Sequence, residues 1–198
     1  MKAINLLLIP ILALAVCFPS AGIGDQTDQR LEQLFETLRG SQDELVLQEA
    51  EAAIWDIWYE SGEETVDQLM RQAAELMRRG DLAAAEKVYS QVIEFLPGFS
   101  EGWNRRATVR FYQRDYAGSL DDIEQTLKLE PRHFGAVWGL GMILGTQQDF
   151  ERAIIAFERL LEIKPNATDA RPRIELLKRE LANNLSNHRV CHFNRVAH

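Results

Sequence analysis

The sequence predicts an all-α protein built from three consecutive helical hairpins. Prolines stand at Pro97, Pro131 and Pro165, and the two intervals between them are equal; we call this interval the repeat length. Six further sets of chemically similar residues share that spacing: Asp81, Asp115 and Asp149; Leu82, Tyr116 and Phe150; Ala85, Ser119 and Ala153; Tyr89, Ile123 and Phe157; Leu69, Trp103 and Val137; Ala73, Ala107 and Gly141. No alternating run of Val, Ile and Thr indicates a strand. A fixed period of this kind is typical of repeat proteins.

Each unit has the pattern of two helices joined by a short turn. In the first half a large residue is followed four positions later by a small one, as with Trp103 and Ala107, so both lie on one helix face. In the second half the order is reversed, as with Ala153 and Phe157. The aspartate of each unit follows the turn and can cap the second helix. Proline ends the unit because it cannot continue a helix.

This pattern closely resembles the tetratricopeptide-repeat family. The third unit matches it best, through Val137, Leu140, Gly141, Leu144, Ala153, Phe157, Leu160 and Pro165. The second unit departs at Arg106 and Arg110, where the family usually has Leu and an aromatic residue. The units are 66–99, 100–133 and 134–167. The resemblance implies a right-handed solenoid of stacked hairpins.

Helical segments flank the repeats. Residues 168–184 carry Ile174, Leu177 and Leu181 at helical spacing, and we expect a C-terminal capping helix there because an end unit exposes an apolar face. Residues 23–62 contain two further apolar stripes, separated at Gly40. We interpret them as a helical hairpin that is either a degenerate repeat or an N-terminal cap.

The first 22 residues have the features of a secretory signal peptide. Lys2 precedes an apolar run at 6–18, and small residues follow it. An uncleaved anchor is the alternative, and lipidation of Cys17 is disfavoured because Val16 stands where a lipobox has a small residue. The layout resembles small exported tetratricopeptide-repeat proteins of Gram-negative bacteria. It implies a periplasmic or cell-envelope location in a bacterium and the secretory pathway otherwise.

The composition and motifs favour a protein without its own chemistry. The net charge of -8 argues against a nucleic-acid partner. Paired carboxylates such as Asp121-Asp122 lie in charged stretches that we expect to be solvated, and His133 lies in a turn between units. The glycines from Gly139 to Gly145 follow no strand, so they do not indicate a nucleotide loop. We therefore predict no catalytic residues and no cofactor.

Histidines gather near the C-terminus. His188 and His192 are four residues apart, with Cys191 beside them, a spacing that also occurs in metal sites. No acidic residue follows Glu180 to support such a site. We predict a flexible tail over 185–198 and no metal site, with adventitious metal binding as the alternative.

The family resemblance also implies a concave groove lined by the first helix of each unit. Carried over by position, its partner-binding residues are Met70, Met77, Arg78, Asn104, Thr108, Phe111, Tyr112, Trp138 and Met142. Trp103 of the second unit is expected to be a core aromatic. Val137 takes that position in the third unit, so Trp138, one residue later, should face the groove. The alternative is that the large apolar members of this set pack against the N-terminal helices.

The expected function is a protein–protein interaction module that scaffolds or assembles partner proteins through this groove. The alternative is a non-catalytic auxiliary or regulatory subunit of a cell-envelope enzyme complex. Chaperone-binding members of the family grip a C-terminal carboxylate with Lys and Asn. The matching positions here hold Met70, Ala74, Arg105, Gly135 and Gly139, so we do not expect that mode of binding.

Overall fold

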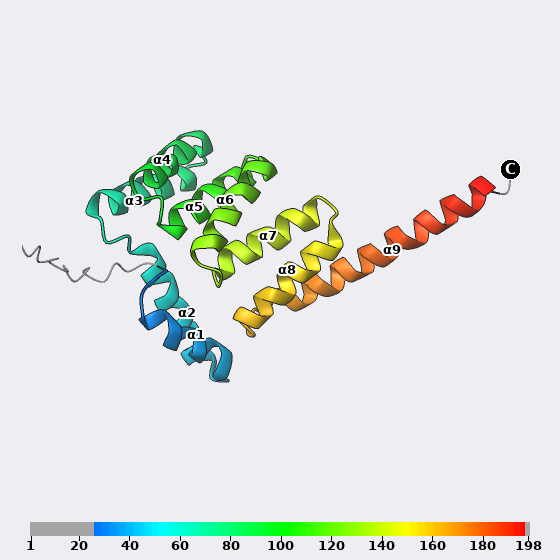
Figure 1. Cartoon of the computed structure of the whole chain (residues 1–198), viewed down its shortest axis with the longest axis horizontal. Coiled ribbons are helices and arrows are strands. Elements are labelled where there is room, and N and C mark those ends of the chain that lie inside the picture. The colour runs from blue at the N-terminus through cyan, green and yellow to red at the C-terminus, as the bar shows by residue number, and fades with distance from the viewer. Residues whose placement is uncertain (1–25, 197–198) are drawn as a thin grey trace, which may run out of the picture.

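The computed structural model describes residues 26–196, with the backbone alone for 185–196, and this part contains nine helices and no strand (Figure 1). The helices are α1 (Arg30–Gly40), α2 (Glu44–Tyr59), α3 (Glu64–Arg78), α4 (Leu82–Phe95), α5 (Ser100–Tyr112), α6 (Tyr116–Leu129), α7 (Phe134–Thr146), α8 (Phe150–Ile163) and α9 (Ala170–Val196). The all-α prediction is confirmed. The predicted signal peptide, residues 1–22, lies outside the described residues.

The repeats form three antiparallel hairpins, α3–α4, α5–α6 and α7–α8, that stack in chain order (Figure 1). The predicted caps are confirmed: Asp81, Asp115 and Asp149 each accept a hydrogen bond from the backbone N–H three residues later, at 3.2, 3.0 and 3.3 Å. The residue before each aspartate has a positive φ, of 80°, 65° and 63°. Gly80 adopts this conformation without steric cost, and the later units place side chains there.

Close helix approach inside a unit depends on the small residue of its first helix. In the third unit a Cβ added to Gly141 would lie 2.7 Å from Cζ of Phe157. Phe157 is fully buried, and so is Val137 on α7. The small residue and the aromatic ring therefore occupy complementary space, as the sequence pattern predicts.

The second unit replaces part of its apolar core by an ion network. Arg106 donates two hydrogen bonds to the carboxylate of Asp122, at 2.7 and 2.9 Å, and Arg110 donates a third at 3.0 Å. Arg110 also pairs with Glu86 at 2.9 Å. Asp122 is 1% exposed, so the expectation of a solvated carboxylate is wrong at this position. Two arginines one turn apart on α5 hold it in the interior, whereas Asp121 is exposed.

Trp103 is not the buried core aromatic that the family position implies. It is half-buried, its Nε1–H donates to the carbonyl of Pro97 at 2.9 Å, and the guanidinium of Arg106 lies 5.1 Å from its ring centre. The preceding turn thus offers the indole an acceptor at the edge of the unit. Ala107 and Ile123 fill the interior between α5 and α6 instead.

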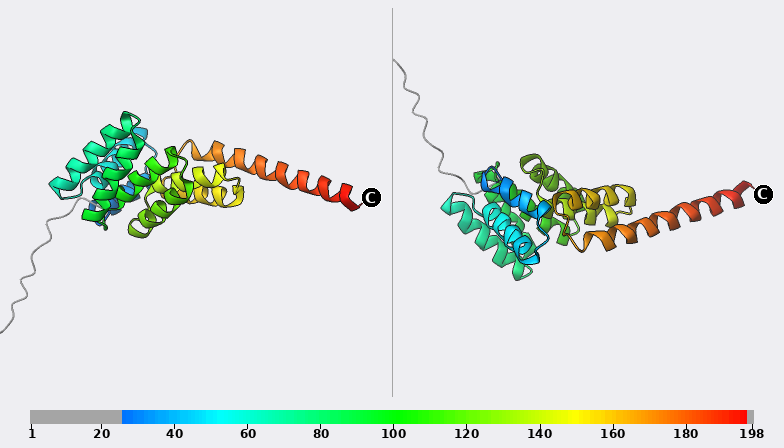
Figure 2. Two further views of the ribbon diagram at one scale, coloured as in Figure 1. Left: turned by 90° about the horizontal axis from the view of Figure 1, so that it is seen from above. Right: turned by 90° about the horizontal axis from the view of Figure 1, so that it is seen from below.

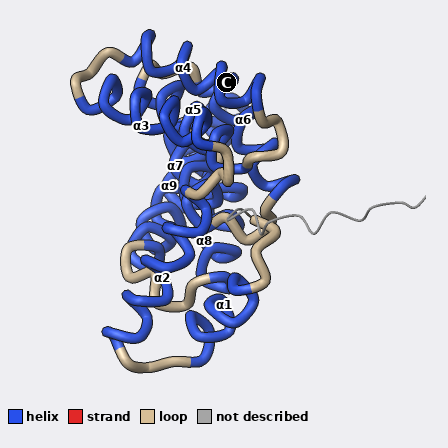
Figure 3. Tube along the Cα trace, turned by 90° about the vertical axis from the view of Figure 1, so that its left-hand side faces the viewer, coloured by secondary structure: helices blue, strands red, loops and turns tan. Residues whose placement is uncertain are grey.

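The N-terminal hairpin α1–α2 packs against the third unit rather than stacking on the first. Phe35, Ile54 and Trp58 share one buried cluster with Phe134 and Phe157. Figures 1 and 3 show that α1 and α2 are not stacked alongside α3 and α4 as a further hairpin would be. The hairpin is therefore neither an added repeat nor a cap of the first unit.

The first unit needs no cap because the outward face of its α3 is polar. On α5, Gly102 and Arg106 face the preceding helix α4. The residues one repeat length earlier on α3 are Gln68 and Gln72, and both are exposed. A polar outer face is what terminal units of repeat arrays require.

The last helix, α9, begins on α8 and continues beyond the repeats (Figure 2). Ala170, Ile174 and Leu177 are buried in the cluster that also contains the core of α8. The sequence analysis predicts a flexible tail from residue 185, but the helix continues to Val196. No Gly or Pro interrupts it after Pro172. Within 26–196 no helix has the length and apolar character needed to cross a membrane.

Candidate functional site

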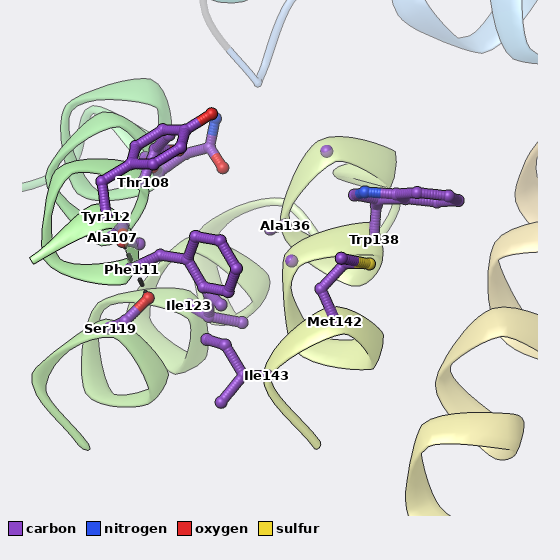
Figure 4. A pocket seen from close by; sticks show the side chains of 13 residues that line it. Ala107, Thr108, Phe111, Tyr112, Ser119, Ile123, Ala136, Trp138, Met142 and Ile143 are labelled. Atoms are coloured by element: carbon purple, nitrogen blue, oxygen red, sulfur yellow. Dashed lines mark hydrogen bonds between the residues drawn. The ribbon is translucent and has the colours of Figure 1, made fainter. Parts of the chain in front are cut away.

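A pocket of about 250 Å³ opens between α5 and α7, and we call it the central pocket (Figure 4). Its lining residues are Asn104, Ala107, Thr108, Phe111, Tyr112, Ser119, Ile123, Gly135, Ala136, Trp138, Gly139, Met142 and Ile143. Figure 4 shows Phe111 reaching from α5 toward α7, where Trp138 and Met142 stand. Large side chains therefore form the rim, while Ala107, Ile123 and Ala136 form an apolar floor.

The structure brings together six of the nine residues predicted for the groove: Asn104, Thr108, Phe111, Tyr112, Trp138 and Met142. The other three lie elsewhere on α3. Met70 lines a separate cleft. Met77 packs on the core of the first unit, and the exposed Arg78 pairs with Glu75 at 2.7 Å.

Trp138 and Met142, one turn apart on α7, separate the central pocket from two neighbouring depressions. Trp138 also lines a depression of about 310 Å³ that includes Trp55 of the N-terminal hairpin. Met142 also lines one of about 250 Å³ that includes Leu176 of α9. The Trp138 ring packs edge-on against Phe157 at 5.1 Å, so it contributes both to the core and to the surface.

Leu176 was missed by the sequence reasoning. It stands one repeat length after Met142, in the same register on α9, and it is 43% exposed. The repeat spacing is the signal that identifies it, whereas the apolar spacing within residues 168–184 predicts only a capping helix. The apolar surface therefore extends one helix further than expected.

The polar side chains that line the central pocket are already hydrogen-bonded inside the protein. The Thr108 hydroxyl donates to the carbonyl of Asn104 at 2.9 Å, and the Ser119 hydroxyl donates to the carbonyl of Ala107 at 2.7 Å. The Asn104 amide donates to Glu101 at 2.8 Å. A ligand thus meets a surface that mainly offers apolar contact.

A buried polar network lies where α5 and α7 begin. The backbone N–H of Ala136 donates to Nδ1 of His133 at 3.1 Å, so this nitrogen carries no proton. The proton is on Nε2, which donates to Oε2 of Glu101 at 2.9 Å, and both side chains are fully buried. The neutral imidazole stacks on Trp58 of α2. Sequence reasoning placed His133 in a turn and gave it no role.

Arg105 is also held within this network. Its Nε donates to Oε1 of Glu101 at 2.5 Å, and its guanidinium lies 4.6 Å from the ring centre of Tyr59. Burial lowers the pKa of Arg105 to about 10, so the side chain stays charged at neutral pH. Because Arg105 already forms an ion pair with Glu101, it does not provide a free positive charge for a carboxylate ligand.

A larger cleft, of about 470 Å³, lies between α2, α3 and α5, and we call it the flank cleft. Its lining residues are Asp56, Tyr59, Glu60, Asp67, Met70, Arg71, Ala74, Tyr89 and Arg105. Met70 and Ala74 stand one repeat length before Asn104 and Thr108, so this cleft occupies the register of the central pocket one unit earlier.

Among the described residues, no group of three or more His, Cys, Asp and Glu side chains is placed to hold a metal ion. The side chains of His188, Cys191 and His192 lie outside the described part of the chain.

Comparison with known sequences finds related repeats. The model of the family described as "Tetratricopeptide repeat" matches residues 104–168. A TPR repeat-containing protein of Rhizobium etli is 35% identical over 156 residues, which cover 79% of this chain and 76% of that protein. A tetratricopeptide repeat and J domain-containing co-chaperone of Cryptococcus neoformans is 30% identical over 86 residues, 43% of this chain and 16% of the co-chaperone.

Solved structures share the fold. The first TPR domain of Spaghetti (RPAP3), bound to the HSP90 peptide SRMEEVD, aligns with a TM-score of 0.57 at 21% identity, over 59% of this chain and 93% of that one. The crystal structure of MamA protein aligns with a TM-score of 0.57 at 17% identity, over 83% of this chain and 87% of that one.

Proposed function

The chain belongs to the tetratricopeptide-repeat family, and on that premise we propose that it binds an apolar peptide or helix of a partner protein in the central pocket. The single observation that carries this proposal is the pocket between α5 and α7, with its aromatic and Met rim over an apolar floor. Amphipathic helices place their apolar faces in grooves of this kind, and Met side chains adapt to irregular partners.

The internal hydrogen bonding of the pocket supports an apolar ligand. With Thr108, Ser119 and Asn104 already bonded within the protein, binding an apolar side chain leaves none of these groups without a partner. Burying an aromatic or Leu side chain there contributes about 1.5–3 kcal/mol.

An acidic C-terminal peptide does not suit this surface. The RPAP3 domain was solved with the peptide SRMEEVD, which carries carboxylates. In this chain the groove positions that could grip a carboxylate supply one cation, Arg105, and Glu101 already neutralises it. We therefore expect SRMEEVD to bind this chain weakly or not at all.

We further propose that the protein is an exported scaffold and that any chemistry belongs to its partners. Tetratricopeptide repeats are typically non-catalytic interaction modules. The apolar run at residues 6–18 supports export, to the periplasm or cell envelope if the source is bacterial. Cell fractionation with sequencing of the mature N-terminus tests this part: a full-length chain in the cytosolic fraction would count against export.

Site-specific crosslinking tests the binding proposal. A photoreactive phenylalanine analogue is placed at Tyr112, which is exposed at the pocket rim, and in a control at Phe95, which is exposed on α4. After irradiation in native cells, crosslinked proteins are identified by mass spectrometry.

We expect a discrete partner from position 112 and none of it from position 95. Equal crosslinking from both positions would contradict the proposal. If the partner is an enzyme that copurifies at fixed stoichiometry, the chain is its auxiliary or regulatory subunit rather than a general scaffold.

A further inference from the structure

The flank cleft contains a polar group with no partner in the described part of the chain. Tyr89 lines this cleft and is 1% exposed, yet its hydroxyl makes no hydrogen bond with any described residue. Burial and the nearby charge of Glu101 raise the pKa of Tyr89, so the hydroxyl stays protonated. The side chain of Tyr89 is buried but its hydroxyl oxygen is not fully enclosed, so a ligand in the flank cleft can reach it and form a hydrogen bond with it.

The charge available in the flank cleft is negative. Both guanidinium groups that line it already have a carboxylate: Arg105 pairs with Glu101 at 2.5 Å and Arg71 with Glu64 at 3.2 Å. Asp56 pairs with no described cation.

The two other carboxylates of the cleft are also weakly compensated. Among the described residues, Asp67 accepts hydrogen bonds only from the neutral backbone N–H and hydroxyl of Ser61. Glu60 lies 3.9 Å from the exposed Arg30. A cation that enters the cleft therefore meets carboxylates that lack a close counter-ion.

We propose that the flank cleft binds a lysine or arginine side chain of the partner whose apolar residues fill the central pocket. This inference rests on the proposed function. An ammonium or guanidinium group donates N–H bonds, which Asp56, Asp67 and the hydroxyl oxygen of Tyr89 can accept. The flank cleft and the central pocket lie in the same register one unit apart. One segment of the partner that carries a basic residue beside apolar residues can therefore reach both.

Peptide selection supplies the probe. A random peptide library displayed on phage is selected against the full chain, and recovered peptides are synthesised with each Lys or Arg replaced in turn by norleucine. We expect a basic residue beside an apolar or aromatic stretch, and its replacement should weaken binding about tenfold. Binding should also weaken between about 0.01 M and about 0.1 M salt, over which the Debye length falls from about 30 Å to about 10 Å.

Variants of the chain locate the effect. Asp56→Asn and Tyr89→Phe should each weaken the basic peptide severalfold and leave the norleucine peptide unchanged. Asp121→Asn, the same change at an exposed position on α6 that has no ion pair with a described residue, is the matched control and should change nothing.

The inference would be overturned if the selection yields acidic peptides. It would also be overturned if the affinity of a basic peptide is unchanged by both Asp56→Asn and Tyr89→Phe. Tyr112→Ala separates it from the proposed function. Peptides that need Tyr112 but no basic residue would leave the central pocket standing and refute the cationic site. Peptides that ignore Tyr112 would count against the central pocket itself.

Discussion

The indole of Trp58 stacks on the imidazole of His133, with ring centres 4.1 Å apart and planes 10° apart. Trp58 belongs to the N-terminal hairpin, and His133 caps the first helix of the third unit. This contact, with the hydrogen bond from His133 to Glu101, joins the hairpin to two repeats at once. The hairpin thus helps to position α5 and α7, the two helices between which the central pocket opens.

Trp58→Ala should destabilise the protein by about 3–5 kcal/mol, because it removes a fully buried aromatic side chain from this junction. Leu45→Ala, on the same helix at a 69% exposed position, should change stability by less than about 0.5 kcal/mol. Urea denaturation followed by circular dichroism measures both. Equal stability of the two variants would mean that the hairpin does not pack as described.

Asp122→Ala should cost about 3–5 kcal/mol, because it leaves the guanidinium groups of Arg106 and Arg110 partly buried without their shared carboxylate. The neighbouring Asp121→Ala, at an exposed position, is the control and should be close to neutral. Thermal melts of both variants decide the point. A neutral Asp122→Ala would show that this carboxylate is solvated after all.

Gly141→Ala should destabilise the third unit, because the new methyl group would lie within 3.0 Å of three ring atoms of Phe157. Overpacking costs about 1–3 kcal/mol, and the better helix propensity of Ala offsets about 1 kcal/mol of it. Gly145→Ala, on the same helix with its nearest neighbour at 3.4 Å, receives the propensity gain without the clash. Comparing the two melting temperatures isolates the packing effect, and a Gly141 variant as stable as the Gly145 variant would argue against it.

Removing residues 168–198 should destabilise the whole array, because Ala170, Ile174 and Leu177 cover α8. Burial of Ile174 and Leu177 together is worth on the order of 5 kcal/mol, comparable to the stability of a small domain. Truncation after Asn184, which keeps these contacts, is the control. If the longer truncation melts at the full-length temperature, α9 does not cap the repeats.

The sequence was sufficient for features that recur once in every repeat length. The Asp caps and the small-to-aromatic pairing of Gly141 with Phe157 follow from local periodicity. The gathering of Thr108, Tyr112 and Met142 at one pocket is what the family resemblance implies for their positions. Prediction from the repeat succeeds for these features because each unit contacts mainly its neighbours.

Features that depend on contacts outside the period could not be predicted. Nothing in the apolar stripe that contains Trp58 indicates that it meets His133 rather than α3. Similarly, the burial of Asp122 follows from its pairing with Arg106 on the preceding helix, not from its own charged neighbourhood. Trp103 is not the expected core aromatic because a local acceptor, the carbonyl of Pro97, holds its indole at the edge of the second unit.

The most direct test of the central claim is the affinity of the crosslinked partner, or of a selected peptide, for chains altered at the central pocket. Tyr112→Ala and Trp138→Ala should each weaken binding by about 2 kcal/mol or more, as aromatic anchors do. Tyr112→Ala should do so without loss of stability, because Tyr112 is 59% exposed, and Phe95→Ala should change neither property. Unchanged affinity in both Tyr112→Ala and Trp138→Ala, with the fold intact, would contradict the account.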